Sequence, residues 1–178
     1  KLDFYNTSKE DFMNIVKNDI TKSITNNYTG FSNSFISSIL ENLNISGNTA
    51  EKYLFSLSSG VASLTSSEIS DNTSSYGILF DAQTYTQNDS YENYGQLVLS
   101  DLKVNDNKVT GSYGTLNIQK YNTVKSSENL FENNTTAGNG GALSVSAAGG
   151  AAVGMSSITD FSDVGSTFSS NTAKRGGA

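Results

Sequence analysis

The stretch NLFENNTTAGNGGALSV, from Asn129 to Val145, contains two short motifs that recur near the end of the chain. There STFSSNTAKRGGA occupies residues 166–178, again with Phe, two residues and Asn, followed by Gly-Gly-Ala. The two copies are offset by 37 residues, measured from Phe131 to Phe168. A pair of motifs that returns together at one offset indicates a repeat protein.

Weaker copies of the first motif occur earlier in the chain, as NISGN, EISDN and KVNDN, each with an apolar residue three positions before Asn. The five asparagines at this position are separated by 24, 35, 27 and 37 residues. They are Asn48, Asn72, Asn107, Asn134 and Asn171. Strand-like segments follow the first four of them, at 53–57, 77–82, 114–119 and 141–146. Unequal spacings predict coils of constant size that carry outward loops of different length.

The sequence therefore predicts an all-β protein, a right-handed parallel β-helix in which each repeat forms one coil. Alternation in LNI at 43–45, LKV at 102–104 and LSV at 143–145 directs Leu, Ile and Val inward. Each repeated Asn is expected to adopt the left-handed backbone of a tight corner, and its amide to join a ladder along the axis. Glycines are expected to supply positive φ at the next corner. These are Gly77, Gly114, Gly140, Gly141, Gly176 and Gly177.

The amino-acid composition argues against several kinds of function. The 178 residues carry a net charge of -6, which argues against nucleic-acid binding. No apolar run approaches the roughly 20 residues of a membrane span. His and Cys are absent, which removes thiol nucleophiles and the common zinc sites. We expect no catalytic residues, no cofactor and no metal.

The motifs FENN…GGAL and FSSN…GGA resemble the FxxN and GGA[ILV] repeats of the chlamydial polymorphic outer membrane proteins. The clear match runs from Asn129 onward. In residues 43–118, Ile or Val replaces Phe and Gly-Gly-Ala is missing. The resemblance implies an extracellular, cell-surface β-helix used in adhesion, without an active site. Its expected partners are proteins or glycans at the cell surface, or further copies in a self-assembly.

Other regions differ from the repeat. Residues 1–33 are predicted to be irregular and helical, with a helix over 8–24 that caps the core or docks a partner. Residues 34–178 are predicted to form the coils. Within them, residues 81–95 form an excursion that holds Tyr85, Tyr91 and Tyr94. Tyrosines on a loop can stack on sugars or fill a protein interface, but the simpler interpretation, which we favour, is a loop folded back on the side of the solenoid. Residues 146–165 are compatible with either a loop or an extra strand.

Asn-x-Ser/Thr sequons offer candidate glycosylation sites. Asn88, on the tyrosine-bearing excursion, is the strongest candidate, and the others are Asn6, Asn27 and Asn44. Sequons also begin at Asn72, Asn133 and Asn134. A sugar on Asn72 or Asn134 would conflict with an inward ladder position.

A polysaccharide-active β-helix enzyme is the alternative function, because paired carboxylates can hydrolyse glycosidic bonds. The nearest acidic pairs are Asp101 with Asp106, Glu128 with Glu132, and Asp160 with Asp163. Each pair is more simply interpreted as a solvated outer face or corner. Arg175 has no acidic neighbour in sequence, and Asn105–Asn107 offers too few oxygens for calcium. Three carboxylates converging at one groove would favour the enzyme.

The last repeat copy reaches only Gly176-Gly177-Ala178, where the earlier copies place an apolar strand. A solenoid coil is stable only against its neighbours, and terminal coils need a polar cap. We therefore expect this chain to be an internal segment of a longer solenoid, continued by other coils. A self-assembling fibre subunit is the third possibility.

Overall fold

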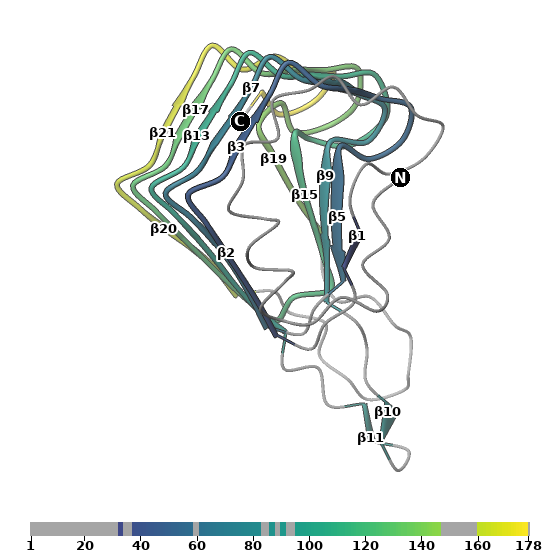
Figure 1. Ribbon diagram of the computed structural model, residues 1–178, viewed down its shortest axis with the longest axis vertical. Helices are drawn as coiled ribbons and strands as arrows, with labels where there is room; N and C mark the ends of the chain where they lie inside the picture. Colours follow the sequence, from purple (N-terminus) through teal and green to yellow (C-terminus); the bar gives the residue numbers. More distant parts are fainter. Residues whose placement is uncertain are drawn as a thin grey trace.

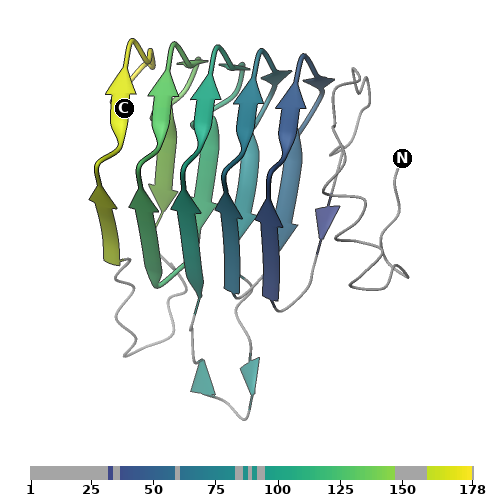
Figure 2. The ribbon, with the colours of Figure 1, turned by 60° about the vertical axis from the view of Figure 1, so that its left-hand side comes forward.

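The computed structural model describes residues 32–33, 37–58, 61–82, 86–87, 90–91, 95–146 and 160–177. In these residues the chain forms a parallel β-solenoid, whose coils lie one behind another in Figure 1 and side by side in Figure 2. Four sheets, which we number I to IV in chain order around a coil, run along the stack. The predicted all-β, parallel, repetitive architecture is confirmed.

Each sheet collects one short strand from each successive coil. Sheet I contains β2 (Ser37–Glu41), β6 (Val61–Thr65), β12 (Gln96–Ser100), β16 (Thr123–Ser127) and β20 (Asp160–Val164). Sheet II contains β3 (Asn44–Ser46), β7 (Glu68–Ser70), β13 (Lys103–Asn105), β17 (Leu130–Glu132) and β21 (Thr167–Ser169). Sheet III contains β4 (Thr49–Ala50), β8 (Thr73–Ser74), β14 (Lys108–Val109) and β18 (Thr135–Thr136). Sheet IV contains β1 (Ser32–Asn33), β5 (Phe55–Ser58), β9 (Ile78–Asp81), β15 (Leu116–Gln119) and β19 (Leu143–Ser146).

We number the coils 1 to 5 from β2, β6, β12, β16 and β20. Equivalent residues of successive coils pair in register, so inward side chains stack in columns. One column consists of Ile45, Ile69, Val104, Phe131 and Phe168. The rings of Phe131 and Phe168 are stacked at 4.7 Å. Because the apolar columns run from coil to coil, the core is continuous along the axis.

The predicted inward positions of LNI and LKV are fully buried. Those of LSV differ, since Leu143 is only half-buried and Val145 is 38% exposed. These two side chains lie on β19, which has no partner on its far side among the described strands. The alternation is therefore as predicted, and the exposure follows from position in the stack.

The four corners differ in length. Two residues connect sheet I to sheet II in every coil, and two connect sheet II to sheet III in coils 1 to 4. The links from sheet IV to sheet I vary most, from residues 59–60 to residues 82–95 and 147–159. The differences in repeat length therefore lie mainly in these links, and the longest of them leave from the corner between sheets IV and I.

Several predictions concern other residues. The helix over 8–24 lies outside the described residues. Within the excursion at 81–95, β10 (Thr86–Gln87) and β11 (Ser90–Tyr91) form an antiparallel pair. We predicted a loop folded back on the solenoid, whereas Figures 1 and 2 place this pair beyond the coils. In the region 146–165, residues 160–164 form β20, an ordinary strand of sheet I.

Candidate functional site

The repeated asparagines line the corner between sheets II and III and form a hydrogen-bonded ladder through all five coils. In each step, the backbone N–H and the side-chain Nδ2 of one Asn donate to the same Oδ1 of the next. For Asn107 and Asn134 these distances are 3.2 Å from the backbone nitrogen and 2.9 Å from Nδ2. The steps from Asn48 to Asn72, from Asn72 to Asn107 and from Asn134 to Asn171 have the same pattern.

The second amide hydrogen of each ladder Asn is also used. Nδ2 of Asn134 donates to the carbonyl oxygen of Val104 at 2.8 Å, and Nδ2 of Asn107 donates to that of Ile69. Asn134 is 0% exposed and Asn107 is 3% exposed. These buried amides provide hydrogen-bond partners for the backbone groups of the corner, which water would otherwise provide.

The predicted backbone of these asparagines is wrong. The left-handed conformation belongs to the residue before each ladder Asn, with φ of 65° at Gly47, 55° at Asp71 and 56° at Asp106. Asn133 and Ser170 continue the same pattern. The physical reason is that the backbone N–H and the side chain of the ladder Asn must both point at the next coil. The preceding residue therefore makes the turn.

Positive φ was predicted for all six glycines of the corner between sheets III and IV, and the prediction is wrong for three of them. Positive φ occurs at Gly77, Gly140 and Gly176, at 67°, 68° and 61°. At Gly114 and Gly141 the constraint is close approach, because a Cβ there would lie 2.5 Å and 2.4 Å from carbonyl oxygens of the next coil. Gly177 is of this second kind, with a carbonyl oxygen 2.7 Å from a built Cβ.

A second polar corner, between sheets I and II, was not predicted. Asn129 accepts at Oδ1 from the backbone N–H of Leu102, and its Nδ2 donates to Leu99 and Ser126. Ser67 Oγ accepts in the same way from the backbone N–H of Leu43, and Ser166 Oγ accepts from the backbone N–H of Asn129. The sequence signal is weak because Leu, Ser and Asn share this column.

The sequons fall into three groups. Asn6, Asn27 and Asn88 lie outside the described residues, although Asn88 follows Gln87 and precedes Ser90, which face each other in the β10–β11 pair. Asn44 is half-buried on β3, and its Oδ1 is buried without a hydrogen-bond partner. The remaining sequons begin at the buried ladder residues Asn72 and Asn134 and at the exposed Asn133.

The structure separates the acidic pairs that the sequence placed close together. Asp101 and Asp106 lie at opposite ends of β13, and Glu128 and Glu132 lie at opposite ends of β17. Asp160 and Asp163 are three positions apart on β20 and so point to opposite faces, with Asp163 in register with the buried Ser126.

The side chains of the Asn105–Asn107 segment form hydrogen bonds within the protein. Asn105 Nδ2 donates to Asp106 Oδ2 at 2.9 Å, and Asn107 Oδ1 accepts two ladder hydrogen bonds. The described residues hold no group of three acidic, His or Cys side chains close enough to bind a metal ion.

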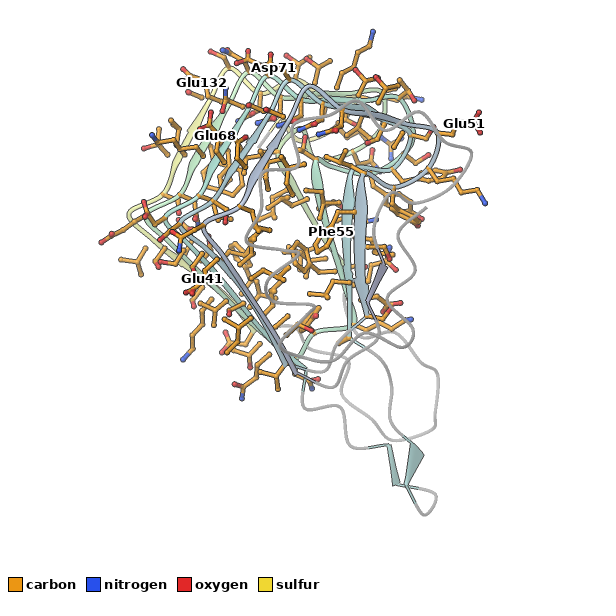
Figure 3. The ribbon with its side chains drawn as sticks, in the orientation of Figure 1. Glu41, Glu51, Phe55, Glu68, Asp71 and Glu132 are labelled. Carbon is orange, nitrogen blue, oxygen red and sulfur yellow. The ribbon has the colours of Figure 1, made fainter. Side chains whose placement is uncertain are left out.

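Figure 3 shows the labelled Glu41, Glu68, Asp71 and Glu132 on the outside of the coils and Phe55 in the core. At the exposed C-terminal coil, Arg175 pairs with Asn139 in a parallel bridge.

A polar cavity of about 390 Å³ lies at the corner between sheets I and II in coils 1 to 3. Its lining comprises Asn42, Leu43, Asn44, Ser66, Ser67, Glu68, Asp101 and Lys103. Two carboxylates and one ammonium therefore face one concave surface. The sequence did not indicate this grouping, because its members come from three repeats.

Tyrosines occupy two further positions. Tyr53, Tyr76 and Tyr113 form a column along the corner between sheets III and IV, with tilted and edge-on rings whose centroids are 5.3 Å and 6.2 Å apart. Tyr121 is 0% exposed at the corner between sheets IV and I. Burial raises the pKa of Tyr121 well above its ordinary value, and the negative charge of Asp81 raises it further. Asp81 itself forms an ion pair with Lys120 at 3.0 Å.

These features define the chain as a repetitive parallel β-solenoid with an asparagine ladder. Comparison with protein-family models, curated proteins and solved structures finds no match to the chain. The resemblance to polymorphic outer membrane protein repeats therefore stays a prediction. In the described part of the chain, no helix is long and apolar enough to cross a membrane.

Proposed function

We propose that this chain is a structural and adhesive module of an extracellular surface, without catalysis, built from repeats of the polymorphic outer membrane protein type. In this proposal the coils are wound right-handed, as nearly all parallel crossover connections are. The module presents binding surfaces to proteins or glycans.

The observation that carries the proposal is that one corner of the coils is short and buried, whereas another varies widely in length. The ladder corner keeps a two-residue link and a buried Asn side chain in coils 1 to 4, which makes the coils a rigid support. The two longest insertions both leave from the corner between sheets IV and I, after Ala82 and after Ser146. Variable loops held by a rigid scaffold are the usual location of binding residues.

The exposed end of the stack supports partnership with other coils. All five residues of β20 are exposed, including Phe161 at 39% and Val164 at 70%. Phe161 is in register with the buried Val124, so its ring points into the core direction. A further coil, or the end of another solenoid, would remove these apolar groups from water. A fibre subunit is the second candidate function on the same observation.

Sedimentation velocity distinguishes these two candidates. A fibre subunit should sediment as concentration-dependent oligomers, and Val164→Lys should disperse them by placing a charge at the exposed edge. Glu128→Lys on the neighbouring coil is the matched control. A wild-type chain that sediments as a monomer at all concentrations would contradict the fibre function.

Adhesion is tested directly with the folded chain coupled to beads. Beads that carry the chain should bind to cultured animal cells more strongly than beads carrying the destabilised variant Asn134→Ala. Equal retention of the two would contradict the adhesive proposal. Release of reducing sugar ends from a polysaccharide panel by the wild-type chain would replace it with the enzyme alternative.

A further inference from the structure

The cavity between sheets I and II combines two columns of residues. Asn42, Ser66 and Asp101 occupy the corner itself with left-handed backbones, at φ of 55°, 47° and 53°. Asn44, Glu68 and Lys103 are in register on the adjoining strands β3, β7 and β13. The corner thus brings six polar side chains to one surface, two from each of three coils.

The charged groups of this cavity have no partners within the protein. In the residues that the structure describes, the side chains of Glu68, Asp101 and Lys103 form no ion pair and no hydrogen bond. Glu68 and Lys103 are neighbours in register, yet their charged atoms are not within ion-pair distance. The Oδ1 of Asn44 is buried and also lacks a partner. Glu68, Asp101 and Lys103 are exposed, so all three are accessible to a ligand.

The grouping is confined to one part of the stack. On coils 4 and 5, the positions equivalent to Asn44, Glu68 and Lys103 are Leu130 and Thr167. The corner positions equivalent to Asp101 are Glu128 and Gly165. The fold therefore does not require polar side chains here, and the cavity chemistry is a property of coils 1 to 3.

The ligand must donate hydrogen bonds to two carboxylates and accept one from Lys103. Sugar hydroxyl groups do both, since each has one donor and two acceptor lone pairs. A cavity of about 390 Å³ lies within the size range of small-molecule sites. A calcium ion would need six to eight oxygens, and two carboxylates on separate coils fall short of that.

We propose that this cavity binds a neutral pyranose sugar, with Glu68 and Asp101 accepting from its hydroxyl groups and Lys103 donating to a ring or hydroxyl oxygen. The inference deepens the adhesive function and rests on it for its biological sense, because it names the ligand class that the surface would recognise.

The test is a titration of the ¹⁵N-labelled chain with methyl glycosides of glucose, galactose, mannose and N-acetylglucosamine, followed by amide chemical shifts. At least one glycoside should give saturable shifts at the amides of residues 42–44, 66–68 and 101–103. Glu68→Gln and Asp101→Asn should each weaken binding by about tenfold or more, since each removes a charged hydrogen-bond acceptor. Asn tolerates the left-handed backbone of position 101, so this variant keeps the fold.

Glu128→Gln is the matched control, because Glu128 occupies the same corner one coil further on and lies outside the cavity. It should bind as the wild type does. The proposal is overturned if no glycoside gives saturable shifts, or if Glu128→Gln weakens binding as much as Glu68→Gln. It is also overturned if calcium chloride alone produces the same shifts. Glycoside binding without cell adhesion would remove the adhesive function and leave the site intact.

Discussion

The corner between sheets II and III and the corner between sheets IV and I are built on opposite principles. At the first, coils 1 to 4 make the turn with two residues and cover it with the next ladder Asn. At the second, the link ranges from residues 59–60 to residues 82–95. The irregular spacing of the repeats, 24, 35, 27 and 37 residues, arises mainly at the second corner.

The contrast teaches where this fold tolerates change. A ladder Asn hydrogen-bonds to both adjacent coils, so a shift in one coil leaves donors and acceptors unpaired in two others. At the corner between sheets IV and I, β10 and β11 lie beyond the coils in Figure 2. Loop lengthening costs only closure entropy, which grows slowly with length.

The strongest test of this contrast is a one-residue insertion at each corner. A Gly inserted between Asp106 and Asn107 should abolish cooperative folding, because it moves Asn107 out of register and reverses the faces of the residues that follow. A Gly inserted between Asn88 and Asp89 should change the free energy of unfolding by less than about 0.5 kcal/mol. Urea unfolding followed by circular dichroism measures both. Comparable losses from the two insertions would refute the contrast.

The next test removes a single ladder amide. Asn134→Ala removes the acceptor for the backbone N–H and for one Nδ2 hydrogen of Asn107, and it removes the donor to the carbonyl oxygen of Val104. The loss should cost about 3 kcal/mol of unfolding free energy. Asn171→Ala should cost about 1 kcal/mol, because water reaches this half-buried end of the ladder. Both values come from urea titrations. If Asn134→Ala unfolds at the wild-type midpoint, the ladder has no stabilising role.

Alkaline pH tests whether the variable corner is nonetheless packed. Burial keeps Tyr121 protonated in the folded state to higher pH than in the unfolded state, whose pKa is near 10.0. Its contribution is therefore complete below pH 10 and is lost as pH rises further, by up to about 1.4 kcal/mol per pH unit. Thermal melts should show a smaller loss between pH 9 and pH 11 for Tyr121→Phe. Tyr113→Phe, a ring 38% exposed, is the control and should retain the wild-type slope.

The smallest expected effect sharpens the account of the tight turns. Glu128 has a φ of 54°, whereas Gly165 occupies the same position one coil further on. Glu128→Gly should raise the free energy of unfolding by about 0.5 to 1 kcal/mol, since Gly has no steric cost in the left-handed region. Ser127→Gly on the adjoining strand should lower it. A destabilising Glu128→Gly would show that its side chain contributes more than its backbone strain costs.

Much of the scaffold could be predicted from the sequence because its motifs repeat. The position of each ladder Asn, the inward alternation of LNI and LKV, and the outward placement of the length differences all follow from the pattern. The backbone of the corner could not, because the motif marks Asn134 while the left-handed residue is Asn133. Asp71, Asp106 and Ser170 occupy the same position in other coils, so no single residue type marks the residue that makes the turn.

The candidate sugar site could not be predicted from the sequence, for a different reason. Asn44, Glu68 and Lys103 are unlike one another, so they form no motif, and spacings of 24 and 35 residues separate them. The acidic pairs chosen by nearness in sequence, such as Asp101 with Asp106, are instead held apart by a strand. In a solenoid, proximity follows the coil register and not the distance along the chain.

The sequence by itself determined that the chain repeats, that its repeats are β coils, and that buried Asn residues mark one corner. These properties depend on periodicity and residue type, which can be recognised along the chain without knowing how the coils pair. Only the tertiary structure decided which residue turns each corner and which outward side chains share a surface. Those outcomes depend on the register between coils, which is fixed when buried amides and apolar columns from different repeats meet.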